Sequence, residues 1–286
     1  MNALAEILDG IEDHIQLLKE MGERTIEIDP AVWTEWKRAV SVRPAPRPVP
    51  AAHPQSVRPP AAHSTFQAPK QEIPTGAKIL SLEERVAAMA QITQEIEACS
   101  ICPFRENRNH IVPGQGNLNS PDVMFIGEAP GAEEDKAGVA FIGAAGQFLT
   151  KMINAMGYDR EDVFIANICK CRPPYNRTPT PEEAMVCFPF LKRQIEIVRP
   201  KTIVLLGTVA AKAILNTQVG VTRLQGQWSR YGTIPVMPTY HPAYVIRFEK
   251  FRQMDKLKEV KIAVWTALNR VLAYLGKPVP SSKKKQ

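Results

Sequence analysis

Four continuous apolar runs between residues 122 and 239 predict buried β-strands. The runs cover residues 122–127, 163–167, 202–207 and 234–239. A strand that is apolar at nearly every position is typical of a parallel sheet covered on both faces. Segments with helical periodicity separate the runs. We therefore expect an α/β fold with three layers, α/β/α, around a central four-stranded parallel sheet.

Capping signals mark where the helices begin. Ser81, with Glu84 three residues later, forms a capping box before a helix that should run to about Ala98. Thr180, followed by Pro181 in the first turn, opens another helix. Further helices are expected from about Ala145, after Gly207, and over residues 255–275.

The first 78 residues differ in kind from the rest. Residues 1–40 carry an amphipathic stripe at helical spacing, formed by Leu4, Ile7, Leu8, Ile11, Ile15 and Leu18. Residues 41–78 are rich in Pro, Ala, Arg, His and Ser and have no apolar period, which is typical of a disordered, partly polyproline linker. The predicted organisation is a helical segment at 1–40, the disordered linker at 41–78, the main domain at 79–277 and a basic tail at 278–286.

The chain has a net charge of +7 and an isoelectric point of about 9.2, which favours a polyanionic partner such as nucleic acid. No stretch approaches the roughly 18 apolar residues of a membrane helix. Residues 1–21 lack the charged start and apolar core of a secretory signal. The five cysteines make an odd count, so no disulfide framework is expected. We expect a cytoplasmic monomer with no membrane partner.

Four of the cysteines have the spacing of a metal centre, because they read Cys99-x2-Cys102 and later Cys171-x15-Cys187. Two thiolates on one turn, joined by two from distant segments, make a four-sulfur cage that suits zinc or an iron–sulfur cluster. A redox pair at the CxxC and plain buried cysteines are the alternatives. The metal interpretation is favoured because no thioredoxin-like pattern surrounds the CxxC.

Unusual polar motifs follow three of the predicted strands. The first strand ends in the sequence Gly-Glu-Ala-Pro-Gly at 127–131, the second ends at Asn167, and the fourth is followed by Tyr-His-Pro-Ala-Tyr at 240–244. Ligands bind at the carboxyl ends of the strands in open parallel sheets, so these segments should converge on one cleft. Each could instead be an ordinary turn or cap. A dinucleotide G-x-G-x-x-G and a P-loop are both absent.

Taken in order, the motifs resemble those of the family 4 uracil-DNA glycosylases, the iron–sulfur members of the uracil glycosylase superfamily. They read GEAPG-x2-ED, FIG-x-AGQ, N-I-x-K-C-RPP-x-NR-x-P and the Tyr-His-Pro-Ala-Tyr segment. The resemblance covers roughly residues 85–275. It implies an enzyme that hydrolyses the N-glycosidic bond of a flipped-out uracil in DNA and leaves an abasic site.

The resemblance also implies a cofactor. A [4Fe–4S] cluster would be held by Cys99, Cys102, Cys171 and Cys187. Cys169 would not be a ligand, since the family cysteine follows the lysine of the N-I-x-K-C run. The cluster is expected to be structural and to pin the segments that carry it to one side of the cleft.

Three residues are expected to carry the catalytic work. The amide of Asn167 can accept the N3–H of uracil and donate to O4, and cytosine presents the opposite pattern. By resemblance, His241 would donate a hydrogen bond to uracil O2 as negative charge develops there. The place of the superfamily's acidic water-positioning residue is taken by Ala129, so that role falls to Glu134 by resemblance, with Asp135 as the alternative. Either carboxylate could instead order the loop through backbone hydrogen bonds.

Other residues are expected to bind the base or the DNA. By resemblance, Phe141 would stack on uracil, and thymine would be excluded at Glu128 and its neighbouring backbone, including Ala129. Asn176 is a further candidate for the site. The segment Pro242–Arg247 resembles a loop that enters the minor groove. Phosphate contacts are expected from Arg172, Arg177 and Arg247.

Two other functions stay open at this point. A protein of the same fold could hold uracil-DNA without turnover, although the inserted basic loop of a related covalently trapping branch is missing after residues 143–146. Alternatively, the N-terminal helix, the linker and a zinc-type module could form a tether that recruits a polymerase or another protein partner.

Overall fold

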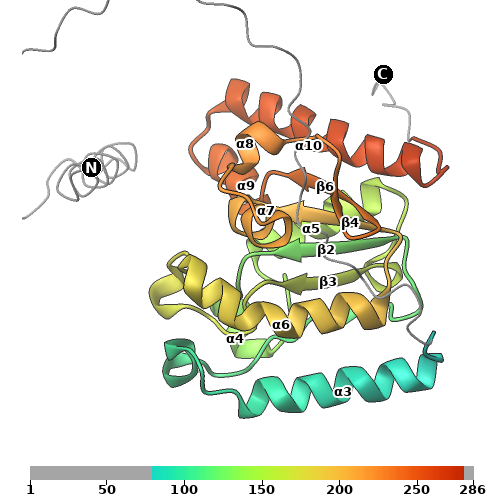
Figure 1. Ribbon diagram of the computed structural model, residues 1–286. Coiled ribbons are helices and arrows are strands. Elements are labelled where there is room, and N and C mark those ends of the chain that lie inside the picture. Colours follow the sequence, from blue (N-terminus) through green and yellow to red (C-terminus); the bar gives the residue numbers. More distant parts are fainter. Residues whose placement is uncertain (1–78, 280–286) are drawn as a thin grey trace, which may run out of the picture. The chain divides into compact units, whose positions relative to one another are not determined.

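Six strands form one sheet in the order β1-β3-β2-β4-β6-β5 (Figure 1). The strands are β1 (Gln115–Gly116), β2 (Val123–Gly127), β3 (Phe164–Asn167), β4 (Thr202–Leu206), β5 (Ser229–Tyr231) and β6 (Ile234–Thr239). This computed structural model describes residues 79–279. The predictions for residues 1–40, 41–78 and the tail from residue 280 lie outside the described residues.

The predicted parallel sheet is confirmed as the centre of this larger sheet. Strands β3, β2, β4 and β6 are parallel neighbours, and each lies within one residue of a predicted apolar run at either end. The edge strands β1 and β5 are antiparallel and were not predicted. They are two and three residues long and only partly buried, so they carry no apolar run that a sequence pattern could detect.

Helices cover both faces of the sheet. They are α3 (Leu82–Ala98), α4 (Ala132–Ala137), α5 (Ala144–Ala155), α6 (Pro181–Val198), α7 (Thr208–Leu215), α8 (Val221–Leu224), α9 (Pro242–Lys250) and α10 (Met254–Tyr274), with 3₁₀ turns η1 (Pro103–Asn107), η2 (Arg160–Asp162) and η3 (Pro174–Asn176). The predicted capping box at Ser81 is present, and Thr180 caps α6 as predicted, where it forms a second capping box with Glu183. Figure 1 shows α3 running beside α6, on the side away from the sheet.

The core divides into two apolar layers, one on each face of the sheet. Along β2, Met124 and Ile126 face the layer that α3, α6 and α7 cover, and Val123 and Phe125 face the layer that α5, α9 and α10 cover. A strand with apolar residues on both faces can only be buried between two layers of helices. The three-layer prediction is therefore confirmed. Across residues 79–279, every helix is too short or too polar to span a bilayer.

The segment after His241 differs from its prediction. Residues 242–247 were expected to form a loop, but they are the first turns of helix α9. Pro242 occupies the first helical position, where its missing N–H and fixed φ are tolerated. The side chain of His241 caps the helix by accepting the N–H of Ala243. His241 is thus held at the start of a rigid element, and Val245 of the same helix is buried in the core.

Candidate active site

A cavity of about 230 Å³ opens at the carboxyl ends of the parallel strands. It is lined by Glu128, Ala129, Pro130, Gly131, Glu134, Phe141, Ala145, Asn167, Pro173, Asn176, Arg177, His241 and Ala243. Gly127 at the end of β2 is paired in register with Asn167 at the end of β3. The predicted convergence of the three polar motifs on one cleft is therefore found. Every residue predicted to catalyse or to bind the base lines this cavity, except the alternative candidate Asp135.

Asn167 presents an unsatisfied acceptor at the cavity wall. Asn167 is 2% exposed, and its Oδ1 has no hydrogen-bond partner in the part of the chain that the structure describes. A buried amide oxygen without a partner is costly, so a group of this kind points to a missing ligand donor. The backbone around it is fixed, because the Nζ of Lys170 donates to the carbonyl of Asn167 at 2.8 Å and to Oε1 of Gln194 at 2.6 Å.

Phe141 forms a flat apolar wall of the same cavity. Its backbone is left-handed, with φ of 53°, an uncommon conformation for an aromatic residue that stores strain near functional sites. Two glycines make room for it. A Cβ at Gly127 would lie 2.4 Å from the Phe141 ring, and one at Gly146 would lie 1.9 Å from its carbonyl oxygen. The ring centroid lies 5.7 Å from that of His241.

His241 is held as a neutral hydrogen-bond donor. Burial lowers the pKa of His241 to about 4, although the nearby Glu134 carboxylate acts in the opposite direction. Its Nδ1 lies 3.1 Å from the N–H of Ala243, which is a donor, so Nδ1 must accept. In the neutral ring the proton then resides on Nε2. The geometry therefore leaves an Nε2–H free to donate.

Most of the acceptor capacity of Glu134 is used within the protein. Its Oε1 accepts the N–H groups of Ile142 and Gly143 at 3.0 and 2.9 Å, and its Oε2 accepts that of Gly131 at 3.1 Å. A carboxylate has about four acceptor positions, so one remains. Glu134 thus ties the loop after β2 to the loop that carries Phe141.

Asp135, the alternative candidate for the water, does not line the cavity. It is fully buried, and its Oδ1 accepts the backbone N–H of Asn109 at 2.9 Å. Its backbone carbonyl lies 3.1 Å from Nδ1 of His110. Successive side chains of a helix point about 100° apart, so Asp135 on α4 turns away from the cavity that Glu134 lines. Its contact with Asn109 corresponds to the structural alternative that the sequence left open for this carboxylate.

Glu128 and Asn176 line the cavity from the segments that follow the neighbouring strands β2 and β3. Burial raises the pKa of Glu128, and a hydrogen bond to Thr178 partly offsets the shift. Asn176 has a left-handed φ of 58°, and its Oδ1 accepts the Nε–H of Arg172 at 2.6 Å.

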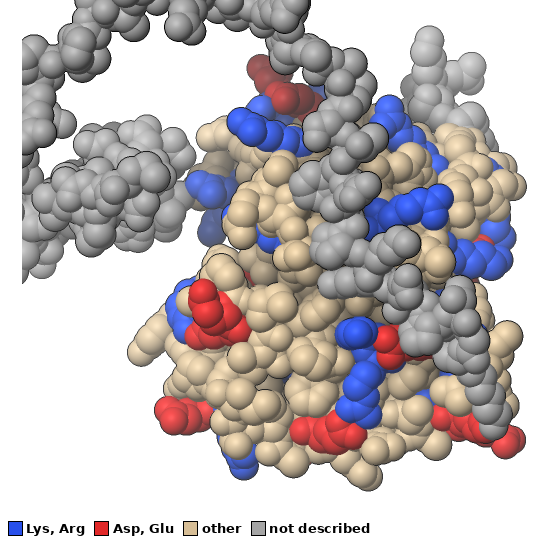
Figure 2. Space-filling view, viewed as in Figure 1, with Lys and Arg blue, Asp and Glu red and all other residues tan. Residues whose placement is uncertain are grey.

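The three predicted phosphate contacts differ in their surroundings. Arg177 pairs with both carboxylate oxygens of Glu183, at 2.7 and 2.6 Å, and Arg172 is bonded to Asn176. Arg247 on α9 is exposed and makes no side-chain hydrogen bond or ion pair within the described part of the chain. Figure 2 shows Lys and Arg side chains mainly over the upper part of the molecule, where α8, α9 and α10 lie, and Asp and Glu side chains mainly over the lower part.

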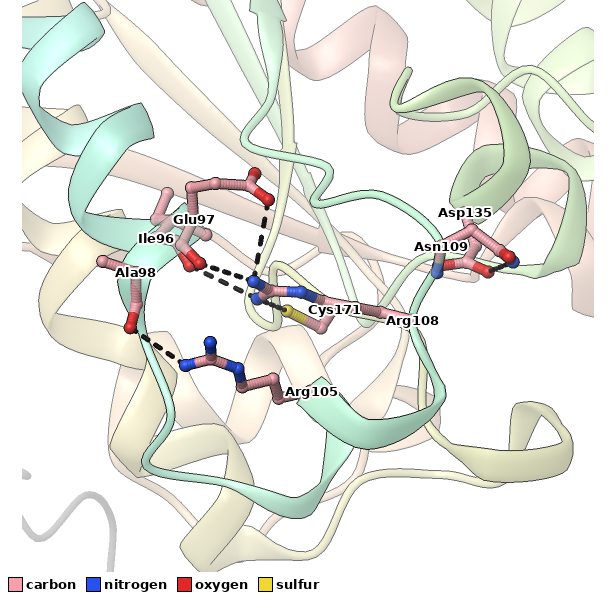
Figure 3. A network of polar contacts seen from close by, with 8 residues as sticks. All are labelled: Ile96, Glu97, Ala98, Arg105, Arg108, Asn109, Asp135 and Cys171. Atoms are coloured by element: carbon pink, nitrogen blue, oxygen red, sulfur yellow. Dashed lines mark hydrogen bonds and ion pairs between the residues drawn. The ribbon is translucent and has the colours of Figure 1, made fainter.

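Arg108, which the sequence did not single out, links the end of helix α3 to one of the predicted sulfur ligands (Figure 3). Its Nη1 donates to the Ile96 carbonyl at 3.3 Å and to Sγ of Cys171 at 3.2 Å. Its Nη2 donates to the Glu97 carbonyl at 2.6 Å. Basic side chains often satisfy the last carbonyls of a helix, and a guanidinium beside sulfur also favours the thiolate.

The four predicted ligand cysteines come from the end of α3, the turn after β3 and helix α6. Burial raises the pKa of Cys171, and Cys102 and Cys99 add to the shift. Burial also raises the pKa of Cys187 to about 12, with Cys171 and Cys102 as further causes. The backbone N–H of Lys170 lies 3.3 Å from Sγ of Cys187. The four thiols are therefore close enough to affect one another.

No group of three or more His, Cys, Asp or Glu side chains among residues 79–279 is placed so that it could hold a single metal ion. The donor chemistry still fits a cofactor, because the four cysteines offer soft sulfur ligands and two of them accept N–H groups. Cys169 is also buried and free.

Comparisons with known proteins agree with this geometry. Residues 113–269 match the family model of the uracil DNA glycosylase superfamily. A type-4 uracil-DNA glycosylase of Thermotoga maritima is 44% identical over 167 residues, which cover 57% of this chain and 85% of that protein. The type-4 enzyme of Archaeoglobus fulgidus is 41% identical over 174 residues, which cover 58% of this chain and 87% of that enzyme. A type-5 uracil-DNA glycosylase of Pyrobaculum aerophilum is 34% identical over 149 residues, which cover 46% of this chain and 65% of that protein.

Proposed function

We propose a site and a mechanism for this chain, which belongs to the type-4 uracil-DNA glycosylases and is a DNA repair enzyme that removes uracil from DNA. The proposed site is the cavity at the carboxyl ends of the strands. The observation that carries it is the pairing, in one cavity, of the buried, unpartnered Oδ1 of Asn167 with the neutral ring of His241. One is an acceptor and the other a donor, which suits the edge of a uracil ring.

Uracil must leave the duplex to reach this cavity, because a stacked base exposes neither its edge nor its glycosidic bond. Phe141 provides the wall on which the flipped ring stacks. Oδ1 of Asn167 accepts the N3–H of uracil, which satisfies the acceptor that has no partner in the protein. Cytosine has an acceptor at N3, so two acceptors would face each other and its binding is disfavoured. Glu128 and Ala129 line the wall that would exclude the methyl group of thymine.

Cleavage of the glycosidic bond leaves negative charge on uracil, largely at O2. The Nε2–H of His241 donates to O2 as that charge grows, and the ring needs no proton from solution because it acts as a neutral donor. A fixed donor of this kind lowers the barrier by about 3–4 kcal/mol. Glu134 is the proposed site for the attacking water, through its one remaining acceptor position, and Asn176 lies across the same cavity.

A [4Fe–4S] cluster on Cys99, Cys102, Cys171 and Cys187 is the proposed cofactor. Its contribution is structural, since it would cross-link three segments of the chain, namely the end of α3, the turn after β3 and helix α6. Arg108 and the N–H of Lys170 would donate to its sulfur ligands. Sulfur ligands of this kind need a reducing compartment, which supports a cytoplasmic location. The main domain at 79–277 and a monomeric state remain predictions, as does a protein partner for residues 1–40.

The test is a strand-cleavage assay on the full chain. Oligonucleotides that carry uracil, hypoxanthine, thymine or cytosine at one position are incubated with the protein and then treated with alkali, which breaks the strand at abasic sites. We expect breakage at uracil and none at cytosine or thymine. A stable complex with uracil-DNA but no break would instead identify a binding protein. Iron and zinc analysis with a visible spectrum distinguishes the cluster from zinc.

DNA contact through Arg247 is supported by its exposure and by its lack of a side-chain hydrogen bond or ion pair among residues 79–279. Arg172 and Arg177 would have to exchange their contacts with Asn176 and Glu183 for phosphate oxygens. Affinity should fall as salt rises, because each phosphate contact releases counterions.

A further inference from the structure

An aromatic side chain projects from the rim of the cavity into solvent. Tyr175 is 98% exposed, and its φ of 56° places it in the left-handed region. Asn176, which follows it, is also left-handed. A tyrosine gains nothing for the fold from full exposure, and a left-handed backbone is unfavourable for any residue with a Cβ. Packing therefore does not explain why a tyrosine occupies position 175.

The turn that carries Tyr175 is braced on both sides. The N–H of Asn176 donates to the carbonyl of Pro173, and the N–H of Arg177 donates to that of Pro174, both at 3.1 Å. The Nε–H of Arg172 holds the side chain of Asn176 from the same turn. The ring is therefore displayed from a fixed point, and little conformational freedom of the backbone would be lost when it binds.

The position of this turn puts the ring beside the flipped base. Pro173, Asn176 and Arg177 all line the cavity, so Tyr175 lies between residues of the cavity wall and points outward. The other exposed tyrosine of this region, Tyr244, follows the cavity residue Ala243, but its ring packs against Tyr240 and Phe248 at centroid distances of 5.2 and 4.9 Å.

The helix that replaces the expected minor-groove loop offers no free apolar wedge at Val245, which is fully buried.

When a uracil leaves the stack, the neighbouring base loses a stacking partner. Aromatic rings stack on bases irrespective of sequence, because every base has a π face. We propose that Tyr175 stacks on the base that neighbours the extruded uracil and so stabilises the open DNA. This inference rests on the proposed function and adds a DNA-positioning residue to it.

The test compares Tyr175→Gly with Tyr175→Phe in the full, metal-replete chain. Removing one stacked base–ring contact should raise the Kd for a uracil oligonucleotide by roughly 5- to 100-fold. The rate at saturating enzyme should change much less, because the ring does not touch the reacting bond. Tyr175→Phe keeps the ring and should bind like the wild type. A Tyr175→Phe variant as weak as Tyr175→Gly would overturn the stacking role.

The thermal stability of Tyr175→Gly provides a second readout, which is not expected to fall with its DNA affinity. Glycine is at ease with a positive φ, so Tyr175→Gly should keep or raise Tm while it weakens binding. 2-Aminopurine next to uracil, whose fluorescence falls on stacking, should be less quenched by Tyr175→Gly than by wild type or Tyr175→Phe. Tyr274→Ala is the control, since Tyr274 is also exposed but lies at the end of α10, outside the turn that borders the cavity.

Unchanged DNA affinity in Tyr175→Gly would overturn the inference while leaving uracil removal established. A wild-type chain that does not release uracil would instead remove the proposed function on which the inference rests.

Discussion

The base cavity and the cysteine-rich region are neighbours along the chain but are built in different ways. The cavity is shaped by sheet register, glycines and backbone hydrogen bonds, so its walls are already in place in the protein alone. The cysteines come from segments outside the sheet and, within residues 79–279, do not close around a single ion. The residues from Asn167 to Cys171 connect the two regions. The comparison teaches that the walls of the cavity are preformed, whereas the adjoining region would gain its cross-link only from the proposed cofactor.

The largest effect is expected from the loss of one sulfur ligand. Cys171→Ala should lose iron, become sensitive to proteases around residues 99–110 and have no measurable activity, because the cross-link between segments is lost. Cys169→Ala is the matched control, since Cys169 is two residues away and buried but is not a proposed ligand. It should keep its iron and its activity within a few-fold. Iron content and visible absorbance of the two variants are the measurements. Loss of iron in Cys169→Ala but not in Cys171→Ala would make Cys169 the ligand and Cys171 the non-ligand.

Substitutions in the preformed cavity should reduce the rate without unfolding the protein. Asn167→Ala and His241→Ala should each lower the single-turnover rate on uracil-DNA by about 100- to 1000-fold, as the removal of a preorganised hydrogen-bond partner does elsewhere. Visible absorbance and Tm should stay near those of the wild type. Wild-type rates in both variants would show that the cavity is not where uracil is cleaved.

The connection between the two regions can be weakened at Lys170. Its buried Nζ joins the carbonyl of Asn167 to the side chain of Gln194. Lys170→Met keeps the length but removes these bonds, and should lower the free energy of unfolding by about 2 kcal/mol, measured by urea denaturation. It should also raise KM for uracil-DNA, because Asn167 is less well fixed. A change in stability without any change in KM would limit Lys170 to a structural role.

The smallest effect concerns pH. Because the pKa of His241 is lowered to about 4 in the folded protein, the unfolded chain binds more protons between pH 4 and about 6.5. The stability that depends on neutral His241 is present above pH 6.5 and is lost as pH falls. Lowering pH from 7 to 5.5 should therefore cost the wild type about 1 kcal/mol more than His241→Asn. Equal slopes of unfolding free energy against pH in the two proteins would contradict a neutral, buried ring.

The sequence by itself determined the centre of the fold and the composition of the cavity. Buried parallel strands need unbroken apolar runs and helices need caps, and both are local signals, so β2, β3, β4, β6 and the start of α6 were predictable. The convergence of Glu128, Asn167 and His241 was also predictable, because the carboxyl ends of parallel strands share one edge of the sheet. Phe141 does not follow a strand, and only the family resemblance placed it at the same cavity.

Only the tertiary structure decided what each polar group contacts. Glu134 and Asp135 are adjacent and chemically alike, yet one lines the cavity and the other binds Asn109. The orphan Oδ1 of Asn167, the tautomer of His241 and the exposure of Tyr175 likewise depend on neighbours from distant segments. Hydrogen bonds and burial are properties of a three-dimensional surrounding, whereas periodicity and capping are properties of a few consecutive residues.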